Sequence, residues 1–423
     1  MKNNLILQAF RIRPFFLLIA SEFFSQFSMN LFNFILLIVV FAIAKSNFAV
    51  SGVVIAFTLP AILFGIWAGV LVDRWNKKNV LFMSNILRGL LLLPLVFLQG
   101  NLLVIYSITF GVSLITQFFI PAETPIIPVL VGRKLLLSAN AIFGMTMYAS
   151  IFLAYALSGP ILYLFGKTNV FIFTSLLFFI AAFFASAIRY KTKIISTTDT
   201  PVVLGFTDEI KTVVRLLSKT KTLYHALFAL TLSQVLIYVM ATIGPGYAER
   251  VLMIEVENFP ILFITPAVIG IALGALIIGS FLHKFDKSSL TKAGLTLLGI
   301  SILLMPFGDK FEARQIVQFI NMYLPHVLKI NAIHVMVTLA FVIGFATAFI
   351  FVPANTTLQE ESTDESRGKI YGVLNTMIGL LAFAPVLLVG VIADSIGVRS
   401  VIVGIGGIVL LIAFIRIFIT DKK

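Results

Sequence analysis

The sequence contains no cysteine, which excludes disulfide bonds and metal sites built from thiolate ligands. Charged residues are also scarce, at 12% of the chain, whereas soluble proteins carry about 25%. Only four histidines occur, and they stand far apart, without the neighbours that a metal or catalytic site needs. These shortages argue against a soluble enzyme, and we expect neither a metal ion nor another cofactor.

Hydrophobic residues, by contrast, make up 60% of the 423 residues, and the mean hydropathy is +1.07. Apolar runs of about 20 residues recur along the whole chain, and a helix of this length spans the hydrocarbon core of a bilayer. The sequence therefore predicts an all-α integral membrane protein with the lipid bilayer as its main partner. The twelve predicted transmembrane helices lie near residues 14–44, 48–72, 79–98, 101–120, 139–163, 169–188, 223–246, 259–283, 289–306, 333–353, 370–393 and 399–420.

Basic residues exceed acidic ones and give a net charge of +13. On a soluble protein this excess would indicate nucleic-acid binding, but in a membrane protein Lys and Arg gather in cytoplasmic loops. We therefore predict both termini in the cytoplasm, in an inner or plasma membrane, and no nucleic-acid partner. With the N-terminus inside, only seven of the 31 basic residues fall outside: Lys45, Lys167, Arg250, Lys310, Arg314, Lys329 and Arg399.

Three short segments recur in the same order in the two halves of the chain. The segment “GVLVDRWNKK” at Gly69–Lys78 matches “GSFLHKFDKS”, which begins 210 residues later. The segment “FIPAE” at Phe119–Glu123 matches “FVPAN” at Phe351–Asn355. Pro160 of “SGPIL” then corresponds to Pro385 of “FAPVL”. Repeats of this kind build many secondary transporters.

The repeats predict two pseudo-symmetric six-helix bundles, at residues 1–190 and 223–423. A cytoplasmic linker at residues 191–222 joins them. Within it, “TDEIKTVVRLLSKTK” has acids at its start, bases at its end and one apolar face, which predicts an amphipathic helix on the inner leaflet.

The segment Gly69–Lys78 places Gly-x-x-x-Asp-Arg and further bases between the second and third predicted spans. Together with “FIPAETPIIPVLV”, “LSANAIFG” and “QEESTDESRGKIYGVLN”, it resembles the major facilitator superfamily, and within it the branch of macrolide and drug exporters. The resemblance covers nearly the whole chain. It implies a secondary transporter that works by alternating access rather than an enzyme.

The resemblance also implies a cytoplasmic gate that latches the two bundles together. A carboxylate in this loop would be stabilised by the free N–H groups at a helix N-terminus. The alternative is a loop whose bases only set the orientation of the chain. The residues of the predicted gate are Gly69, Asp73, Arg74, Lys77, Lys78 and Glu123.

Glu123 follows Pro121 at the cytoplasmic end of the fourth span, so we expect it to pair with Arg74 unless it is an ordinary solvated loop residue. Asn76 stands where the family usually has glycine. Because Asn tolerates a left-handed backbone, we expect such a turn there.

A polar stripe runs along the first span, where Glu22, Gln26, Asn30 and Asn33 recur at steps of four, four and three residues. This spacing places them on one helix face, which we expect to line a cavity or a helix interface because polar groups facing lipid are costly. In the superfamily the first, fourth, seventh and tenth spans line the pathway. The resemblance therefore adds Gln117, Gln234 and Tyr238 to the cavity-lining candidates.

Glu22 is the acid that lies deepest in a predicted span, which makes it the candidate for proton coupling. Arg88 lies at a similar depth in the third span, so a structural ion pair is the alternative. Gly159 and Pro160 in “ALSGP” resemble the Gly-Pro motif of drug antiporters, and we expect Pro160 and Pro385 to bend their helices.

These observations favour a monomeric secondary transporter that exports amphipathic small molecules, with protons as the coupling ion. Uptake of a small polar solute is the alternative within that class, and an importer of anions should show buried Arg or Lys in its cavity. A membrane sensor or scaffold is a third reading. A sensor usually carries a soluble domain, and the longest polar segment here has about 33 residues, near residues 190–222.

Overall fold

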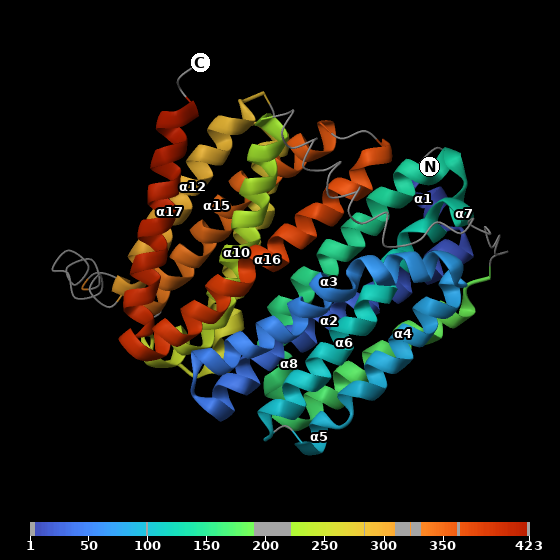
Figure 1. Cartoon of the computed structure of the whole chain (residues 1–423), viewed down its shortest axis with the longest axis horizontal. Coiled ribbons are helices and arrows are strands. Elements are labelled where there is room, and N and C mark those ends of the chain that lie inside the picture. Colours follow the sequence, from blue (N-terminus) through green and yellow to red (C-terminus); the bar gives the residue numbers. More distant parts are fainter. Residues whose placement is uncertain are drawn as a thin grey trace. The chain divides into compact units, whose positions relative to one another are not determined.

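The structure is a computed structural model that describes residues 5–98, 100–189, 221–282, 284–308, 322, 331–361 and 364–420. Within these ranges every regular element is a helix (Figure 1). The chain forms two compact units. Unit 1 comprises Met1–Ile43 and Gly52–Asp208, and unit 2 comprises Ala44–Ser51 and Glu209–Lys423. The predicted linker helix lies outside the described residues, and the predicted domain boundaries stay a prediction.

Unit 1 is built around α4, which packs against both α6 and α8. The short helices α1, α5 and α7 lie at the ends of the long ones and contact α8, α6 or both. The helices from the N-terminus to the end of the unit are α1 Leu5–Phe10, α2 Arg13–Ala44, α3 Asn47–Arg74, α4 Lys77–Leu92, α5 Leu95–Leu98, α6 Leu102–Glu123, α7 Ile127–Val131 and α8 Leu136–Ala187.

The long helix α8 contains two membrane spans, because Gly166 interrupts it with a φ of 71° and a ψ of 173°. This backbone conformation suits glycine, which has no Cβ to clash. The described residues contain eleven helical segments long and apolar enough to cross a membrane, and one of them is the 50-residue Ser138–Ala187. Counting that segment as two gives the twelve spans that the sequence predicts, and the predicted fold class is confirmed.

Unit 2 is built around α15, which packs against α10, α11 and α12. The contact with α11 is especially close, since a Cβ on Gly344 would lie 1.7 Å from the carbonyl oxygen of Ala267. Helix α17 packs against α12, and α16 against α10. The bounds are α10 Lys221–Arg250, α11 Thr265–Ser280, α12 Lys287–Leu304, α15 Ala332–Glu360, α16 Asp364–Ile396 and α17 Val398–Thr420.

The segments matched by sequence occupy corresponding places in the two units. Asn76 precedes α4 and accepts hydrogen bonds from the N–H groups of Lys78 and Asn79, while Asp286 precedes α12 and accepts one from Ser289. Both residues are therefore helix N-caps. The left-handed turn expected at Asn76 is wrong: its φ of −69° and ψ of 108° are extended, because a capping side chain needs an extended backbone to reach the first free N–H groups.

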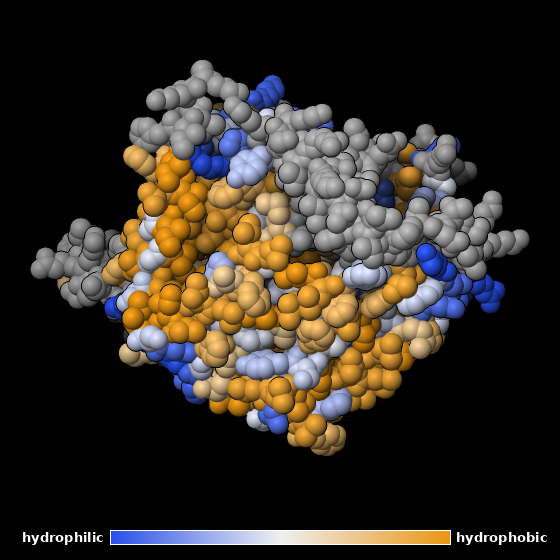
Figure 2. Space-filling view, viewed as in Figure 1, coloured by the Kyte–Doolittle hydropathy of each residue, from blue (hydrophilic) through white to orange (hydrophobic). Residues whose placement is uncertain are grey.

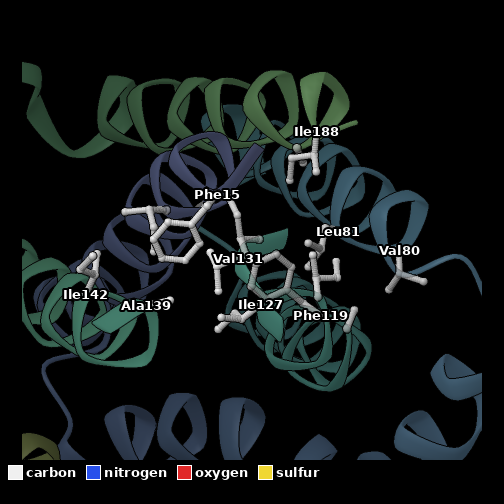
Figure 3. Packing of buried hydrophobic residues seen from close by; sticks show 14 of the residues in the cluster. Phe15, Val80, Leu81, Phe119, Ile127, Val131, Ala139, Ile142 and Ile188 are labelled. Atoms are coloured by element: carbon white, nitrogen blue, oxygen red, sulfur yellow. The ribbon is translucent and has the colours of Figure 1, made fainter. Parts of the chain in front are cut away.

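Apolar side chains fill the interior of each unit and also cover much of its surface. In unit 1 a buried cluster joins Phe15 of α2, Leu81 of α4, Phe119 of α6 and Val131 of α7 (Figure 3). On the face drawn in Figure 2, hydrophobic residues predominate among the described ones and hydrophilic residues gather toward its margins. Such exposure is expected where lipid tails rather than water surround the helices.

A buried charge cluster as the candidate functional site

The guanidinium group of Arg88 lies deep inside unit 1, where the residue is only 1% exposed. It is placed between two aromatic rings, 4.3 Å from the ring centre of Phe119 and 4.8 Å from that of Phe178. Its Nη2 donates hydrogen bonds to Ser25 Oγ at 2.9 Å and to Asn85 Oδ1 at 2.7 Å. Ring faces and polar oxygens thus replace the water that a cation loses on burial.

Two carboxyl groups, those of Glu22 and Glu123, are neighbours of each other and of Arg88. Glu22 is 1% and Glu123 5% exposed. Both oxygens of Glu22 and Oε2 of Glu123 are buried and accept no hydrogen bond from the residues that the structure describes. The cluster therefore combines one buried cation with two buried acids, and three of the four carboxyl oxygens accept no hydrogen bond from the described residues.

The three charged residues come from three helices: Glu22 from α2, Arg88 from α4 and Glu123 from α6. On α2, Glu22 and Ser25 are three residues apart, and on α6, Phe119 and Glu123 are four apart, so each pair shares one helix face. Phe119 also belongs to the apolar cluster of Figure 3, so one ring covers the guanidinium and packs against the hydrophobic interior. Sequence reasoning missed this arrangement, although the spacing of Phe119 and Glu123 was a usable signal.

Charge balance defines what this site can do. Two ionised carboxylates beside one guanidinium would leave a net negative charge at a buried position, which is strongly unfavourable. A single proton on either carboxyl group removes that charge. The protonated acid can then donate a hydrogen bond to its neighbour, as in carboxyl pairs that share a proton. The cluster is therefore chemically suited to bind and release one proton.

The polar stripe of α2 continues along the helix beyond Glu22, and its side chains are partly buried. Asn30 donates from its side-chain nitrogen to the carbonyl oxygen of Gln26 at 2.8 Å and accepts from the hydroxyl of Tyr155, of α8, at 3.4 Å. Asn33 Oδ1 is buried and accepts no hydrogen bond from the described residues. These polar groups are at least partly buried, and whether the stripe lines a cavity stays a prediction.

The remaining cavity-lining candidates lie on two other helices. Gln117 of α6 is half-buried, donates to the carbonyl oxygen of Ser113 at 3.2 Å, and lies beside Gly65 of α3. Gln234 and Tyr238 lie one turn apart on α10 in unit 2 and are partly buried. Their part in a substrate pathway stays a prediction.

The predicted gate would latch the two bundles together, and it stays a prediction. Arg74 is exposed, Lys77 and Lys78 are half-buried, and the side chain of Asp73 lies outside the described residues. A Cβ on Gly69 would meet no described atom within 4 Å.

Glu123 is placed differently from both sequence expectations. It is neither a solvated loop residue nor a neighbour of the exposed Arg74, because α6 continues through Pro121 and carries it into the interior. Its charged neighbours are Glu22 and Arg88. Glu22 and Arg88 thus lie in one group with Glu123, and an ion pair between Glu22 and Arg88 stays a prediction.

The prolines expected to bend helices lie inside long helices. Pro160, preceded by Gly159, lies within α8, and Pro385 lies within α16. Both helices continue on either side of the proline, and the bends themselves stay a prediction.

Comparison with known proteins identifies relatives along nearly the whole chain. The sequence model described as Major Facilitator Superfamily matches residues 18–320 and 268–423. The uncharacterized MFS-type transporter YfiS of Bacillus subtilis (strain 168) is 23% identical over 394 residues, which cover 90% of this chain and 87% of that protein. A second protein of the same organism, named as a bacilysin exporter, BacE, is 23% identical over 368 residues, covering 85% and 84%.

Solved transporter structures share the fold at low sequence identity. The nucleoside transporter NupG superposes with a TM-score of 0.71 at 13% identity, over 96% of this chain and 99% of that one. An inward-facing, unoccupied bacterial homologue of the human lysosomal transporter Spinster gives a TM-score of 0.70 at 15% identity, over 97% of each chain. At these identities the likeness shows the fold and not the substrate.

Proposed function

The chain belongs to the Major Facilitator Superfamily, and from this membership we propose that it exports amphipathic small molecules, driven by a proton gradient. As a member of this family it is a multi-pass membrane transporter and not an enzyme. The proposal itself concerns the coupling ion, the direction of transport and the class of substrate. One observation carries it: the buried group of Glu22, Glu123 and Arg88.

Proton coupling needs a group that changes its protonation during the cycle, and the carboxyl pair supplies one. Arg88 balances one negative charge, so the second carboxyl stays neutral only while it holds a proton. Loss of that proton leaves an uncompensated charge in the interior, which unit 1 can relieve by admitting water or by moving its helices. The number of protons bound by the carboxyl pair is thereby linked to the conformation of unit 1.

Export of an amphipathic compound is favoured over uptake of an anion. An importer of anions needs a cation free to contact its substrate, but Arg88 is enclosed by Phe119, Phe178 and its hydrogen-bond partners. The stripe of α2 offers neutral amides, which suit uncharged polar groups on an otherwise apolar molecule. The sequence relative named as a bacilysin exporter supports the same direction.

Topology and oligomeric state form part of the proposal. The bias of basic residues supports cytoplasmic termini, two bundles at residues 1–190 and 223–423, and a cytoplasmic linker between them. We expect a monomer. Reporter fusions at position 206 should report the cytoplasm and fusions at position 318 the outside, and reports from the same side would contradict this topology.

The coupling role is tested by Glu22→Gln. Everted membrane vesicles from a pump-deleted host are given a panel of amphipathic antibiotics and fluorescent cationic dyes, with and without an uncoupler. Wild-type protein should accumulate at least one compound only while the gradient lasts. Glu22→Gln should abolish accumulation and keep passive exchange, because Gln retains shape and hydrogen bonding but cannot titrate. The exposed Glu255 supplies the matched control, Glu255→Gln, which should behave as wild type.

Undiminished uphill transport by well-expressed Glu22→Gln protein would reject Glu22 as the coupling residue. If Glu123→Gln then abolished it, the proton site would be assigned to Glu123 alone. Accumulation that survives the uncoupler in the wild type would reject proton coupling altogether.

A further inference from the structure

The hydrogen bonds that Arg88 donates to the described residues all go to uncharged oxygens. Its Nη2 donates to Ser25 Oγ at 2.9 Å and to Asn85 Oδ1 at 2.7 Å, and its Nε donates to the carbonyl oxygen of Ser84 at 3.3 Å. Since an Nη nitrogen carries two hydrogens, Ser25 and Asn85 together use the full donor capacity of Nη2. Two neutral side chains therefore determine where this half of the guanidinium points.

The carboxyl groups of the cluster stand outside this set of hydrogen bonds. Both oxygens of Glu22 and Oε2 of Glu123 are buried and accept no hydrogen bond from the residues that the structure describes. The charged groups that act on these acids are each other and Arg88 of α4, whereas α8 contributes the uncharged ring of Phe178. Arg88 thus acts on these three oxygens through its charge and not through a hydrogen bond.

The surroundings of the guanidinium keep it in this position. Asn85 Nδ2 donates to the carbonyl oxygen of Leu81 at 3.0 Å, and this second bond orients the amide so that Oδ1 accepts from Arg88. The rings of Phe119 and Phe178 lie 4.3 and 4.8 Å from the guanidinium carbon. Because Arg88 is only 1% exposed, bulk water does not replace an acceptor that is removed here.

Helix α2 carries three buried serines, and the middle one differs from its neighbours. Ser21 Oγ and Ser28 Oγ donate to carbonyl oxygens of α8, at 2.9 and 2.7 Å, and so join the two helices. Ser25 Oγ instead accepts from Arg88, and no donation from Ser25 to a described residue is seen. The same residue type thus holds helices together at two positions and holds the cation at the third.

We propose that Ser25 and Asn85 are positioning residues for proton coupling, which keep Arg88 from bonding directly to the acids. A guanidinium bonded to a carboxylate would favour the ionised form, so that the proton would bind only at lower pH. Held by neutral acceptors, Arg88 still balances one negative charge and leaves the second carboxyl able to take up and release its proton. The inference rests on the coupling role proposed above for Glu22 and Glu123.

Removing one neutral acceptor should lower the pH at which the carboxyl pair takes up its proton. Ser25→Ala frees one N–H of Nη2 without changing charge or adding bulk. The freed donor should bond to a carboxyl oxygen that lacks one, and the pH midpoint should fall by about one unit. Asn85→Leu, which removes the other acceptor at similar size, should lower it likewise. Ser25→Thr keeps the hydroxyl and should retain the wild-type midpoint.

Infrared spectra of the full-length protein in liposomes, recorded over a series of pH values, measure this midpoint. The C=O band of a protonated carboxyl reports the proton itself, and subtracting the spectra of Glu22→Gln isolates the pair from the other acids. Ser21→Ala and Ser28→Ala are matched controls, because each removes a buried hydroxyl from the same helix without removing an acceptor of Arg88. Both should leave the midpoint unchanged.

The outcomes separate the positioning role from the coupling role. A midpoint that falls in Ser25→Ala and stays in place in Ser28→Ala is the expected result. A band that titrates in the wild type but has the same midpoint in Ser25→Ala would overturn the positioning role and leave the shared proton intact. An equal shift in Ser28→Ala would also overturn it, since a general loosening of unit 1 would then explain both. If the pair shows no titrating band in the wild type, the shared proton is rejected, and the proposed coupling with it.

Discussion

Removing the acids of the buried cluster one at a time and then together should give a characteristic pattern of stability. If the pair holds one proton, Glu22→Gln leaves Glu123 to balance Arg88, and the amide donates the hydrogen bond that the acid donated. Each single Gln variant should therefore stay within about 1 kcal/mol of the wild-type free energy of unfolding. The double variant leaves Arg88 buried without a counter-charge and should lose about 3–5 kcal/mol.

Replacing the cation should reverse that loss. Adding Arg88→Gln to the double variant removes the unpaired charge, and most of the lost stability should return even though the cluster is gone. The free energy of unfolding is measured by circular dichroism of detergent-solubilised protein during titration with sodium dodecyl sulfate. Removing two exposed acids, with Glu255→Gln and Glu361→Gln, serves as the matched control and should change little.

The result that would refute this reasoning is a single variant as unstable as the double. It would mean that both carboxylates are ionised in the native state, so that each is needed against Arg88 and no shared proton exists. A double variant as stable as the wild type would equally contradict the charge balance, because it would show Arg88 to be satisfied by Ser25, Asn85 and the two rings alone.

Three further predictions follow from single contacts. Asp73→Asn should slow the transport of every substrate by a similar factor and leave binding nearly intact, and a selective change of substrate profile would reject its gating role. Gly344→Ala should cost about 1–3 kcal/mol or prevent folding, since its Cβ meets the carbonyl oxygen of Ala267, whereas Gly407→Ala, with no described atom within 4 Å, should not destabilise the protein. Asp286→Ala should cost about 1 kcal/mol at neutral pH, measured by unfolding. Backbone N–H donation from α12 lowers the pKa of Asp286, so its contribution is present above the ordinary aspartate pKa and is lost as pH falls through the lowered value.

The transmembrane helices could be predicted from the sequence because a bilayer imposes one strong requirement, a long apolar run. Most predicted ends agree with the structure to within a few residues, as for α2, predicted at 14–44 and observed at Arg13–Ala44. The larger differences lie where helices extend beyond the apolar run. Helix α15 continues to Glu360 and α16 begins at Asp364, several residues into polar sequence. Hydropathy detects the hydrocarbon core and not the length of a helix.

The candidate site was less predictable, because it depends on how helices rotate against one another. The spacing of Glu22, Gln26 and Asn30 was sufficient to place a polar face on α2. No spacing within one helix shows that Arg88 of α4 and Glu123 of α6 meet that face. The predicted fourth span ends at residue 120, whereas α6 continues through Pro121 to Glu123.

The hydrogen bonds that Asp394 accepts from Ser46, Asn47 and Phe48 illustrate a second limit of sequence reasoning. Asp394, Arg250 and Lys45 stand at the ends of predicted spans, where charged residues are common and usually solvated. Nothing in their local sequence separates a cap for a remote helix from an ordinary terminal charge. The left-handed backbone of Lys45 and the close approach of Gly246 and Gly390 appear only in the folded chain.

The two charge clusters use the same residue types under opposite conditions of solvation, and this difference separates their roles. The cluster at Glu22 is enclosed, so its energy depends on how many protons it holds. The ion pair of Asp394 with Arg250 is partly exposed, so its energy depends on whether the partners are in contact and little on net charge. Substitutions should therefore act independently. Glu22→Gln should alter the number of protons moved per substrate, whereas Asp394→Asn should leave that number unchanged. A changed number of protons per substrate in Asp394→Asn would show that one event controls both clusters, and the separation argued from solvation would be wrong.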